Sequence, residues 1–423
     1  MSPVSDGVSG TSGAFRRHQW AIAALFCSLG FQYATWASRI PALKDDLGLT
    51  AAEVGFLLMA AGIGAVISFP LVNPLMTRFG SRRLALLSAL GLTLLLFALA
   101  AAPNYPVALL VLGVDGVLVG CLNVAMNAQG AALEARFERT TMARLHATFS
   151  GGSLLAALLA SRMNAMTSSV SAHFAVAAVL LLLFCVYART GLLTDDASEQ
   201  QTSEQTSQKK EEENEKAKEK KKQWSMPSGV VLWMCVAMAF GTVTEGAMND
   251  WSTLYMQEVA DASHQLAPLG IAVISAMMVL ARIFADGWRG RFGDGRVVVA
   301  GSALATAGLA FALLGGGVVT ALTGFACVGL GIAAVTPCVY VAAARQGSDA
   351  LALVAAMGTT GLLAGPPLIG FVANATSLVW GLGVVAGAAA VVCLCGTRIR
   401  WRDVPEESSV TSPVEAVPGS GTG

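Results

Sequence analysis

Twelve apolar stretches of membrane-spanning length, separated by short polar breaks, follow one another along this 423-residue chain. Charged residues make up 13% of the sequence, against about 25% in soluble domains, and nearly all of them lie in the breaks. A bilayer-crossing helix needs about 20 residues, and in lipid its backbone polar groups must be satisfied internally. We predict an all-α membrane protein with spans at 20–38, 54–75, 84–102, 107–128, 143–165, 172–187, 229–250, 266–288, 297–317, 321–344, 351–373 and 378–395.

Lys and Arg residues are distributed very unevenly between the two ends of these stretches. If the N-terminus is cytoplasmic, only Arg39, Lys44 and Arg162 fall on the outer side, and Arg282 lies inside a span. The remaining basic residues then lie on the cytoplasmic side, and an excess of Lys and Arg in short loops sets the orientation of a membrane protein. We expect a multi-pass protein of the inner (plasma) membrane with both termini in the cytoplasm. The net charge of zero argues against nucleic-acid binding.

The sequence contains no recognisable catalytic, metal-binding or cofactor-binding pattern. All eight Cys lie within apolar stretches and no C-x-x-C occurs, which favours neither a disulfide framework nor a zinc site. The motifs G-x-S-x-G, H-E-x-x-H and G-x-x-x-x-G-K-[ST] are absent, so an ATP-driven motor is not indicated. We therefore expect neither an enzyme nor a cofactor.

A low-complexity segment at 194–223 divides the apolar stretches into two sets of six. It runs from Asp, Ser, Gln and Thr into Lys and Glu, a composition that cannot bury enough apolar surface to fold alone. We interpret it as a disordered cytoplasmic linker. The predicted parts are a tail at 1–19, a six-helix bundle at 20–190, the linker at 191–226, a second six-helix bundle at 227–396 and a tail at 397–423.

The two sets of six resemble each other in sequence. The tripeptide Arg78-Phe79-Gly80 recurs as Arg291-Phe292-Gly293, each time after the second span of its half. Trp36-Ala37-Ser38 at the end of the first span is similar to Trp251-Ser252-Thr253 at the end of the seventh. Internal duplication of a helical unit is typical of secondary-transporter folds.

With these features the chain resembles the major facilitator superfamily, over nearly its whole length. The basic loop of that family reads roughly Gly-x-x-x-Asp-Arg-x-Gly-Arg-Arg, and the segment from Asn73 to Arg83 matches it with the Gly and the Asp replaced. The segments Trp36–Pro41, Leu47–Leu49 and Asn249–Ser252 look similar to a bacterial branch that neighbours the fucose-permease-like transporters. The resemblance implies alternating access around a central cavity lined by the first helix of each three-helix unit.

Polar residues on those implied cavity helices are the candidates for substrate binding: Gln32, Trp36, Asn123, Asn127 and Asn249. Gln32 and Trp36 lie one turn apart on one helix face, as do Asn123 and Asn127. Together they would hydrogen-bond a hydrophilic solute. The alternative is that these amides only cross-link neighbouring helices.

Two carboxylates, Asp115 and Glu245, are candidates for proton coupling because an ionisable residue inside a span is costly and by default functional. Asp115 lies near mid-depth, and Glu245 lies one turn before Asn249. The alternatives are a permanently protonated Asp115 and a hydrated Glu245. His146 is the next candidate, although a solvated or gate-bonding His is the simpler interpretation. Asp250 is expected at the interface.

Five residues near the inner ends of the second and eighth spans are candidates for gating: Arg78, Arg82, Arg282, Asp286 and Arg291. Arg282 and Asp286 lie four apart and so share a helix face. They would form either a static salt bridge or a latch with Arg291 that breaks when the inner gate opens.

Trp residues mark the ends of several spans, as in an aromatic belt. Trp20, Trp224, Trp288 and Trp401 are predicted at the cytoplasmic interface, and Trp36 and Trp251 at the outer one. Taken together, the sequence predicts a monomeric secondary transporter that moves a small polar organic solute with protons across the bilayer. Efflux of a hydrophobic or amphipathic metabolite or drug, and a transporter-like sensor that moves nothing, are the alternatives.

Overall fold

The computed structural model describes residues 6–194 and 228–401; the predicted tails and most of the predicted linker, including Trp224, lie outside this range. The described residues form α-helices joined by short turns, without a β-strand. The helices are α1 (Asp6–Ala37), α2 (Ile40–Leu47), α3 (Ala51–Ala100), α4 (Tyr105–Phe137), α5 (Met142–Met166), α6 (Val170–Arg189), α8 (Gly229–Glu258), α9 (Leu269–Phe292), α10 (Asp294–Gly315), α11 (Gly317–Ile332), α12 (Val335–Ala344), α13 (Ser348–Ala375) and α14 (Leu378–Arg398).

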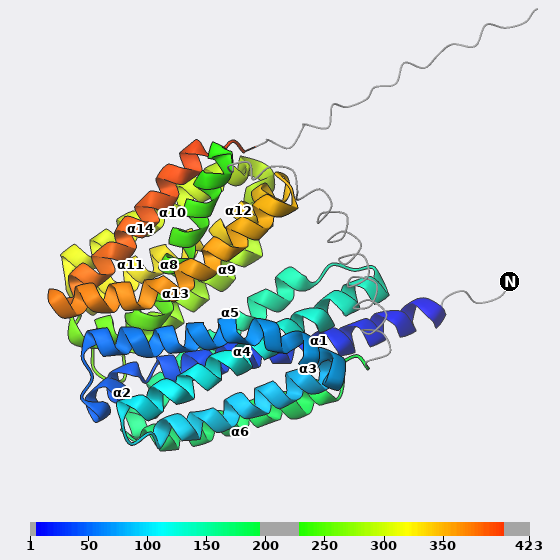
Figure 1. Ribbon diagram of the computed structural model, residues 1–423, viewed down its shortest axis with the longest axis horizontal. Helices are drawn as coiled ribbons and strands as arrows, with labels where there is room; N and C mark the ends of the chain where they lie inside the picture. The colour runs from blue at the N-terminus through cyan, green and yellow to red at the C-terminus, as the bar shows by residue number, and fades with distance from the viewer. Residues whose placement is uncertain (1–5, 195–227, 402–423) are drawn as a thin grey trace, which may run out of the picture.

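These helices form two bundles, which we call the N half (α1–α6) and the C half (α8–α14). Figure 1 shows the N half below and the C half above, with α13 of one lying along α3 of the other. A second contact between the halves joins α5 and α9. The long helices run back and forth between two ends of the molecule, so each half is a layer of antiparallel helices.

The two ends of the molecule differ sharply in charge. One end, the basic side, carries Arg78, Arg82, Arg83, Arg189, Arg291, Arg296 and Arg398. The other end, the α2 side, carries α2 and the turns that begin α4, α6 and α9, with Arg39, Lys44 and Arg162 as its described basic residues. The segregation expected from the sequence is thus present in the fold.

Twelve crossings result from these helices, although eight helices are long and apolar enough to span a membrane by length and composition alone. Helix α3 has 50 residues, about 75 Å at 1.5 Å per residue, and it bends at Gly80 to cross twice. Helices α1, α5 and α9 complete the set, and α11 with α12 forms one interrupted crossing. The predicted architecture of two six-helix bundles is confirmed.

The repeat seen in the sequence is also a repeat of backbone geometry. Gly80 has φ 71° and ψ 164°, and Gly293 has φ 81° and ψ 152°. Both reverse the chain on the basic side with a left-handed φ that only Gly adopts easily. The guanidinium of Arg78 lies over the Phe79 ring at 5.6 Å, and that of Arg291 over the Phe292 ring at 5.4 Å. The turn between the second and third spans therefore has similar backbone geometry in both halves.

Small residues bring the helices within each half into backbone contact, as expected where no hydrophobic force acts between helices in lipid. A Cβ added to Gly152 of α5 would lie 2.1 Å from the carbonyl oxygen of Cys27 on α1. A Cβ on Gly116 of α4 would lie 1.8 Å from the carbonyl oxygen of Ala61 on α3. These contacts make each half a tightly packed unit.

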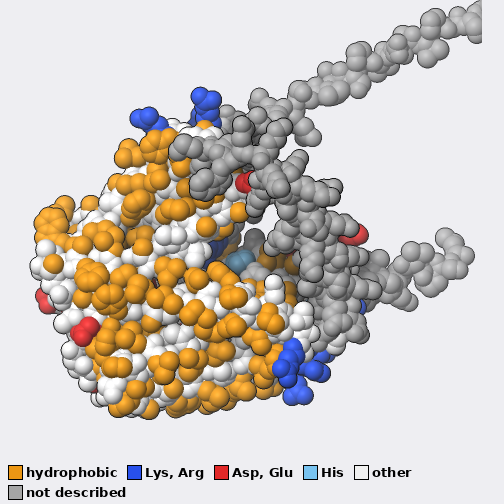
Figure 2. All heavy atoms as spheres, in the orientation of Figure 1, with side chains coloured by type: hydrophobic (Ala, Val, Ile, Leu, Met, Phe, Trp, Pro, Cys, Tyr) orange, Lys and Arg blue, Asp and Glu red, His pale blue; other side chains and the backbone are white. Residues whose placement is uncertain are grey.

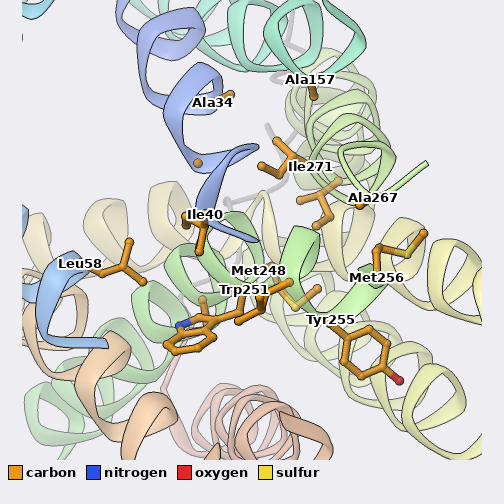
Figure 3. Close-up of a cluster of buried hydrophobic side chains, with 14 of the residues drawn as sticks. Ala34, Ile40, Leu58, Ala157, Met248, Trp251, Tyr255, Met256, Ala267 and Ile271 are labelled. Carbon is orange, nitrogen blue, oxygen red and sulfur yellow. The ribbon is translucent and has the colours of Figure 1, made fainter. Parts of the chain in front are cut away.

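Between the halves, the apolar core is continuous on the α2 side and divided on the basic side. One buried cluster on the α2 side joins residues of both halves, such as Ala34, Leu58, Trp251 and Ile271 (Figure 3). Towards the basic side, one cluster belongs to the N half and another to the C half. The halves are therefore packed together at one end and separate at the other.

This core corrects two expectations from the sequence. Trp36 and Trp251 were predicted at a lipid interface, but their exposed fractions are 2% and 0%. Asp250 was also expected at the interface, and it is buried with its carboxylate hydrogen-bonded to Tyr33. The sequence places these residues at span ends, where contact between the two halves buries them instead of exposing them to the interface.

Candidate functional site

A cavity of about 640 Å³ lies between the two halves, on the basic side of the shared core. Figure 2 shows the molecule hollowed between the halves, with a His and a basic side chain visible inside. Its walls come from α1, α4 and α5 of the N half and from α8, α9 and α12 of the C half. The polar side chains in its lining are Asn123, His146, Glu245, Arg282, Arg289 and Thr336, and the aromatic ones are Phe26, Tyr33, Phe149 and Tyr340.

An ion pair between neighbouring helices of the C half lies in the cavity. Nη2 of Arg282 on α9 donates to Oε1 of Glu245 on α8 over 3.1 Å. Their side chains are 25% and 26% exposed, so both groups reach the cavity. Nη1 of Arg282 also donates to the hydroxyl of Ser150 on α5 of the N half. Arg282 thus joins the carboxylate of one half to the other half.

The break between α11 and α12 shapes the wall opposite. Helix α11 ends at Ile332 and α12 begins at Val335. Pro337 lies in the first turn of α12 and has no backbone N–H. It therefore cannot donate the hydrogen bond that a helix continuous from α11 into α12 would need at this position. Ala333, Thr336 and Pro337 line the cavity at this point. The tenth span, predicted as one helix, is therefore interrupted at the depth of the cavity.

Of the candidate site residues, Asn123, Glu245 and Arg282 line the cavity, and so does His146. The His146 ring packs edge-on to Phe26 with centroids 4.9 Å apart. Asn127 lies beside Asn123 and donates to its side-chain oxygen over 2.7 Å. The structure therefore brings three of the predicted residue positions and the alternative proton carrier to one cavity.

Gln32 and Asp115 form a separate buried pair within the N half. Nε2 of Gln32 on α1 donates to Oδ1 of Asp115 on α4 over 2.7 Å. Asp115 is 3% exposed, and neither residue belongs to the cavity lining. This contact has the helix-linking geometry that the sequence allowed as the alternative for Gln32.

The remaining candidates whose side chains the structure describes lie outside the lining. Nδ2 of Asn249 donates to the backbone oxygen of Glu245 over 2.9 Å, and Trp36 is buried in the shared core. On the basic side, Nη2 of Arg82 donates to the backbone oxygen of Arg189 over 2.9 Å. Arg78 and Arg291 lie at the two glycine turns. Asp286 lies in α9, and its side chain lies outside the part that the structure describes.

Contacts between the halves on the α2 side close the cavity there. The hydroxyl of Tyr33 on α1 donates to the carboxylate of Asp250 on α8, and Lys44 of α2 pairs with Glu258 of α8. Ser161 of α5 donates to the backbone oxygen of Gln265 over 2.6 Å. These contacts and the shared apolar core form what we call the α2-side gate.

Two residues that join the halves, one at the α2-side gate and one beside Arg282, were not predicted from the sequence. Tyr33 and Ser150 each bond to the other half of the chain, at sequence separations of 217 and 132 residues. Neither Tyr33 nor Ser150 is ionised at neutral pH or belongs to a recognisable motif, so no local signal identified them. Their roles depend on how the two halves meet.

The comparisons with known proteins agree with this architecture. The sequence model of the Major Facilitator Superfamily matches residues 21–349. The chain belongs to the major facilitator superfamily. This MFS protein is 30% identical over 373 residues to an uncharacterised MFS-type transporter of Yersinia pestis, covering 85% of this chain and 90% of that protein. It is also 30% identical over 392 residues to the membrane protein MosC of Rhizobium meliloti, covering 88% and 89%.

Solved structures show the same fold at low identity. The nucleoside transporter NupG superposes with a TM-score of 0.66 at 14% identity, covering 91% of this chain and 98% of that one. A D-xylose-proton symporter superposes with a TM-score of 0.68 at 14% identity, covering 92% and 98%. Among the residues that the structure describes, this MFS protein has no cluster of His, Cys, Asp and Glu that could hold a metal ion.

Proposed function

We propose that this protein is a secondary active transporter that moves a small polar organic solute by alternating access. The observation that carries the proposal is the cavity between the halves, closed by the α2-side gate and flanked by two separate apolar clusters on the basic side. A binding cavity at the interface of two repeats, around which the repeats rock, is the arrangement that alternating access requires.

The charge difference between the two ends gives the orientation. Short loops rich in Lys and Arg stay in the cytoplasm, so the basic side and both termini face the cytoplasm of the inner membrane. The α2 side then faces outward. With the α2-side gate closed, the described conformation presents its cavity to the cytoplasm.

Proton coupling is assigned to Glu245, with Arg282 as its partner. A carboxylate in a span is costly when charged and unpaired, and protonation of Glu245 would remove its attraction for Arg282. Released from Glu245, Arg282 is free to change its contact with Ser150 in the opposite half. In this way the binding of a proton is linked to movement of the halves. Asp115 remains the second candidate and His146 the third.

Gating is assigned to the two glycine turns on the basic side. Arg78 and Arg82 flank Gly80, and Asp286 and Arg291 precede Gly293. Arg78, Arg82 and Arg291 do not line the cavity that contains Glu245, so the turns are expected to control the rate of cycling and not the affinity for solute.

A second candidate function is efflux of an amphipathic metabolite. It is favoured by the aromatic and apolar part of the cavity, where Phe26, Leu29, Met126 and Phe149 lie together. The polar solute is preferred because an ion pair, the amide of Asn123 and the imidazole of His146 line the same cavity. In addition, the structural neighbours named above are described as nucleoside and xylose-proton transporters.

Flux measurements on reconstituted protein test both functions. Purified protein in proteoliposomes with an interior pH dye is offered sugars, nucleosides, organic acids and amphipathic drugs, one at a time. Solute-dependent proton movement with a polar solute supports the proposal, and proton movement only with drugs supports efflux. Solute binding without any flux under a proton gradient would show a sensor and refute transport.

A further inference from the structure

We propose that a second cavity, on the α2 side between the two halves, binds a small zwitterionic solute with its carboxylate directed inward onto Arg39. This cavity measures about 260 Å³ and shares no lining residue with the central cavity. The site and its ligand are additional to the transport function and do not depend on the identity of the transported solute.

The first observation is a buried positive charge that forms no ion pair with the residues that the structure describes. Arg39 lies in the turn between α1 and α2 and is 4% exposed. Its Nε donates to Nδ1 of His173 over 3.0 Å, and its Nη2 has no hydrogen-bond partner among the described residues. Burial lowers the pKa of Arg39 to about 10, so the guanidinium is charged at neutral pH. Buried charges in proteins are normally paired, so an anionic group is expected to bind beside Arg39.

The second observation is the cavity that Arg39 lines. Ser38 and Thr253 line it too, and their buried hydroxyls have no hydrogen-bond partner among the described residues. A guanidinium and two hydroxyls are donors suited to the several lone pairs of a carboxylate. A carboxylate seated here would satisfy the charge of Arg39 and both hydroxyls.

The outer part of the cavity has the opposite preference. Asp45 and Asp46 line it and are exposed at its mouth. These acceptors attract an ammonium group and repel a second carboxylate. The arrangement of donors inside and acceptors outside therefore favours a short zwitterion over a plain acid or a plain amine.

Because the cavity lies between the two halves, a ligand bound in it would also affect the conformation of the protein. Arg39 and Asn164 belong to the N half and Thr253 to α8 of the C half. A ligand held by both halves binds only when the α2-side gate is closed, so it stabilises that state by its binding free energy. The segment Trp36–Pro41, which the sequence singled out, thereby gains a role that the central cavity does not give it.

Three probes with three carbons each test the ligand class on the full-length protein in detergent by isothermal titration calorimetry. β-Alanine carries both charges, propionate only the carboxylate and propylamine only the amine. We expect β-alanine to bind most tightly, propionate more weakly and propylamine not at all. Arg39→Gln should weaken β-alanine binding about tenfold or more, as for loss of a hydrogen bond to a charged group. The control Arg162→Gln removes an exposed charge of the same side and should change little.

A second set of variants separates the site from general electrostatics. The double variant Asp45→Asn, Asp46→Asn should weaken β-alanine binding and strengthen propionate binding, because the repulsion is removed. Thr253→Val should weaken both carboxylate probes even if Arg39→Gln fails to fold. Equal binding of all three probes, or β-alanine binding unchanged in Arg39→Gln and Thr253→Val, overturns the proposal. Equal losses in Arg39→Gln and Arg162→Gln also overturn it.

Cross-linking measures the conformational consequence directly. Ser161→Cys with Gln265→Cys places two thiols across the α2-side gate, where the native residues are hydrogen-bonded. Added β-alanine should raise the rate of disulfide formation, and the further change Arg39→Gln should abolish that increase. A rate that β-alanine leaves unchanged or lowers contradicts a ligand that bridges the halves.

Discussion

Arg282 of α9 donates hydrogen bonds both to Glu245 of its own half and to Ser150 of the opposite half. The Nη2–Oε1 distance to Glu245 is 3.1 Å, and all of these side chains come together beside the central cavity. One guanidinium therefore senses the charge of a carboxylate and touches the other half of the molecule. This relationship makes Glu245 the first carboxylate to test.

Glu245→Gln should abolish accumulation of solute against a gradient and spare solute exchange. The amide cannot take up or lose a proton, so the step that protonation permits is no longer linked to the proton gradient. Counterflow and proton-driven uptake in proteoliposomes measure the two activities. Glu258→Gln, a carboxylate of the same helix that pairs with Lys44 on the α2 side, is the control. If Glu245→Gln still concentrates solute with protons, the coupling lies at Asp115 or His146.

Asp115→Asn should leave accumulation and folding largely intact, whereas Asp115→Ala should lower stability. An Asn can keep a hydrogen bond to Gln32, whose Oε1 has no partner among the described residues. An Ala leaves the buried amide of Gln32 unsatisfied, at a cost of about 1–3 kcal/mol. Thermal unfolding followed by tryptophan fluorescence measures the difference. Loss of accumulation in a well-folded Asp115→Asn protein would transfer the coupling role to Asp115.

Gly152→Ala should destabilise the N half, and Gly151→Ala should not. The new Cβ at position 152 would lie 2.1 Å from the Cys27 carbonyl oxygen, whereas position 151 has no atom within 4 Å. Forcing α1 and α5 apart costs about 1–3 kcal/mol, as overpacking does, and Ala at position 151 gains about 0.5–1 kcal/mol of helix propensity. Melting temperatures of the two neighbouring variants in detergent test this, and equal values would refute close packing of α1 on α5.

Tyr33→Phe should open the α2-side gate more than Lys44→Gln does. Tyr33 donates to a buried carboxylate, Asp250, and such bonds contribute about 1.5–3 kcal/mol. The Lys44–Glu258 pair is partly exposed, and pairs of that kind contribute about 0–1 kcal/mol. Double electron–electron resonance measures the opening as the distance between spin labels at positions 101 and 376, one on each half. A larger shift from Lys44→Gln would reverse the assignment.

Both termini and the segment 194–223 should be inaccessible from outside intact cells. The reason is the concentration of Lys and Arg on the basic side. In a protein whose native Cys are replaced, a single Cys at position 205 is treated with a membrane-impermeant maleimide before and after the cells are opened. Arg162→Cys, on the α2 side, is the positive control for external labelling. Labelling at position 205 in intact cells would refute the orientation and the two-half arrangement around a cytoplasmic linker.

The sequence by itself determined the number of spans, their order and the division into two halves. These follow from local properties, because a run of apolar residues needs a bilayer or a core wherever it lies, and a loop with Arg78, Arg82 and Arg83 resists crossing the membrane. The repeated Arg-Phe-Gly tripeptide also indicated the equivalent turns at Gly80 and Gly293, since a left-handed φ is a property of one residue.

Only the tertiary structure decided which polar residues meet. Glu245 and Arg282 are 37 residues apart, Gln32 and Asp115 are 83 apart, and Tyr33 and Asp250 are 217 apart. Helical periodicity places a side chain on a face but not opposite a partner, because the partner depends on which helices pack and at what depth. For the same reason Trp36, Trp251 and Asp250 were expected at an interface and are buried where the two halves close.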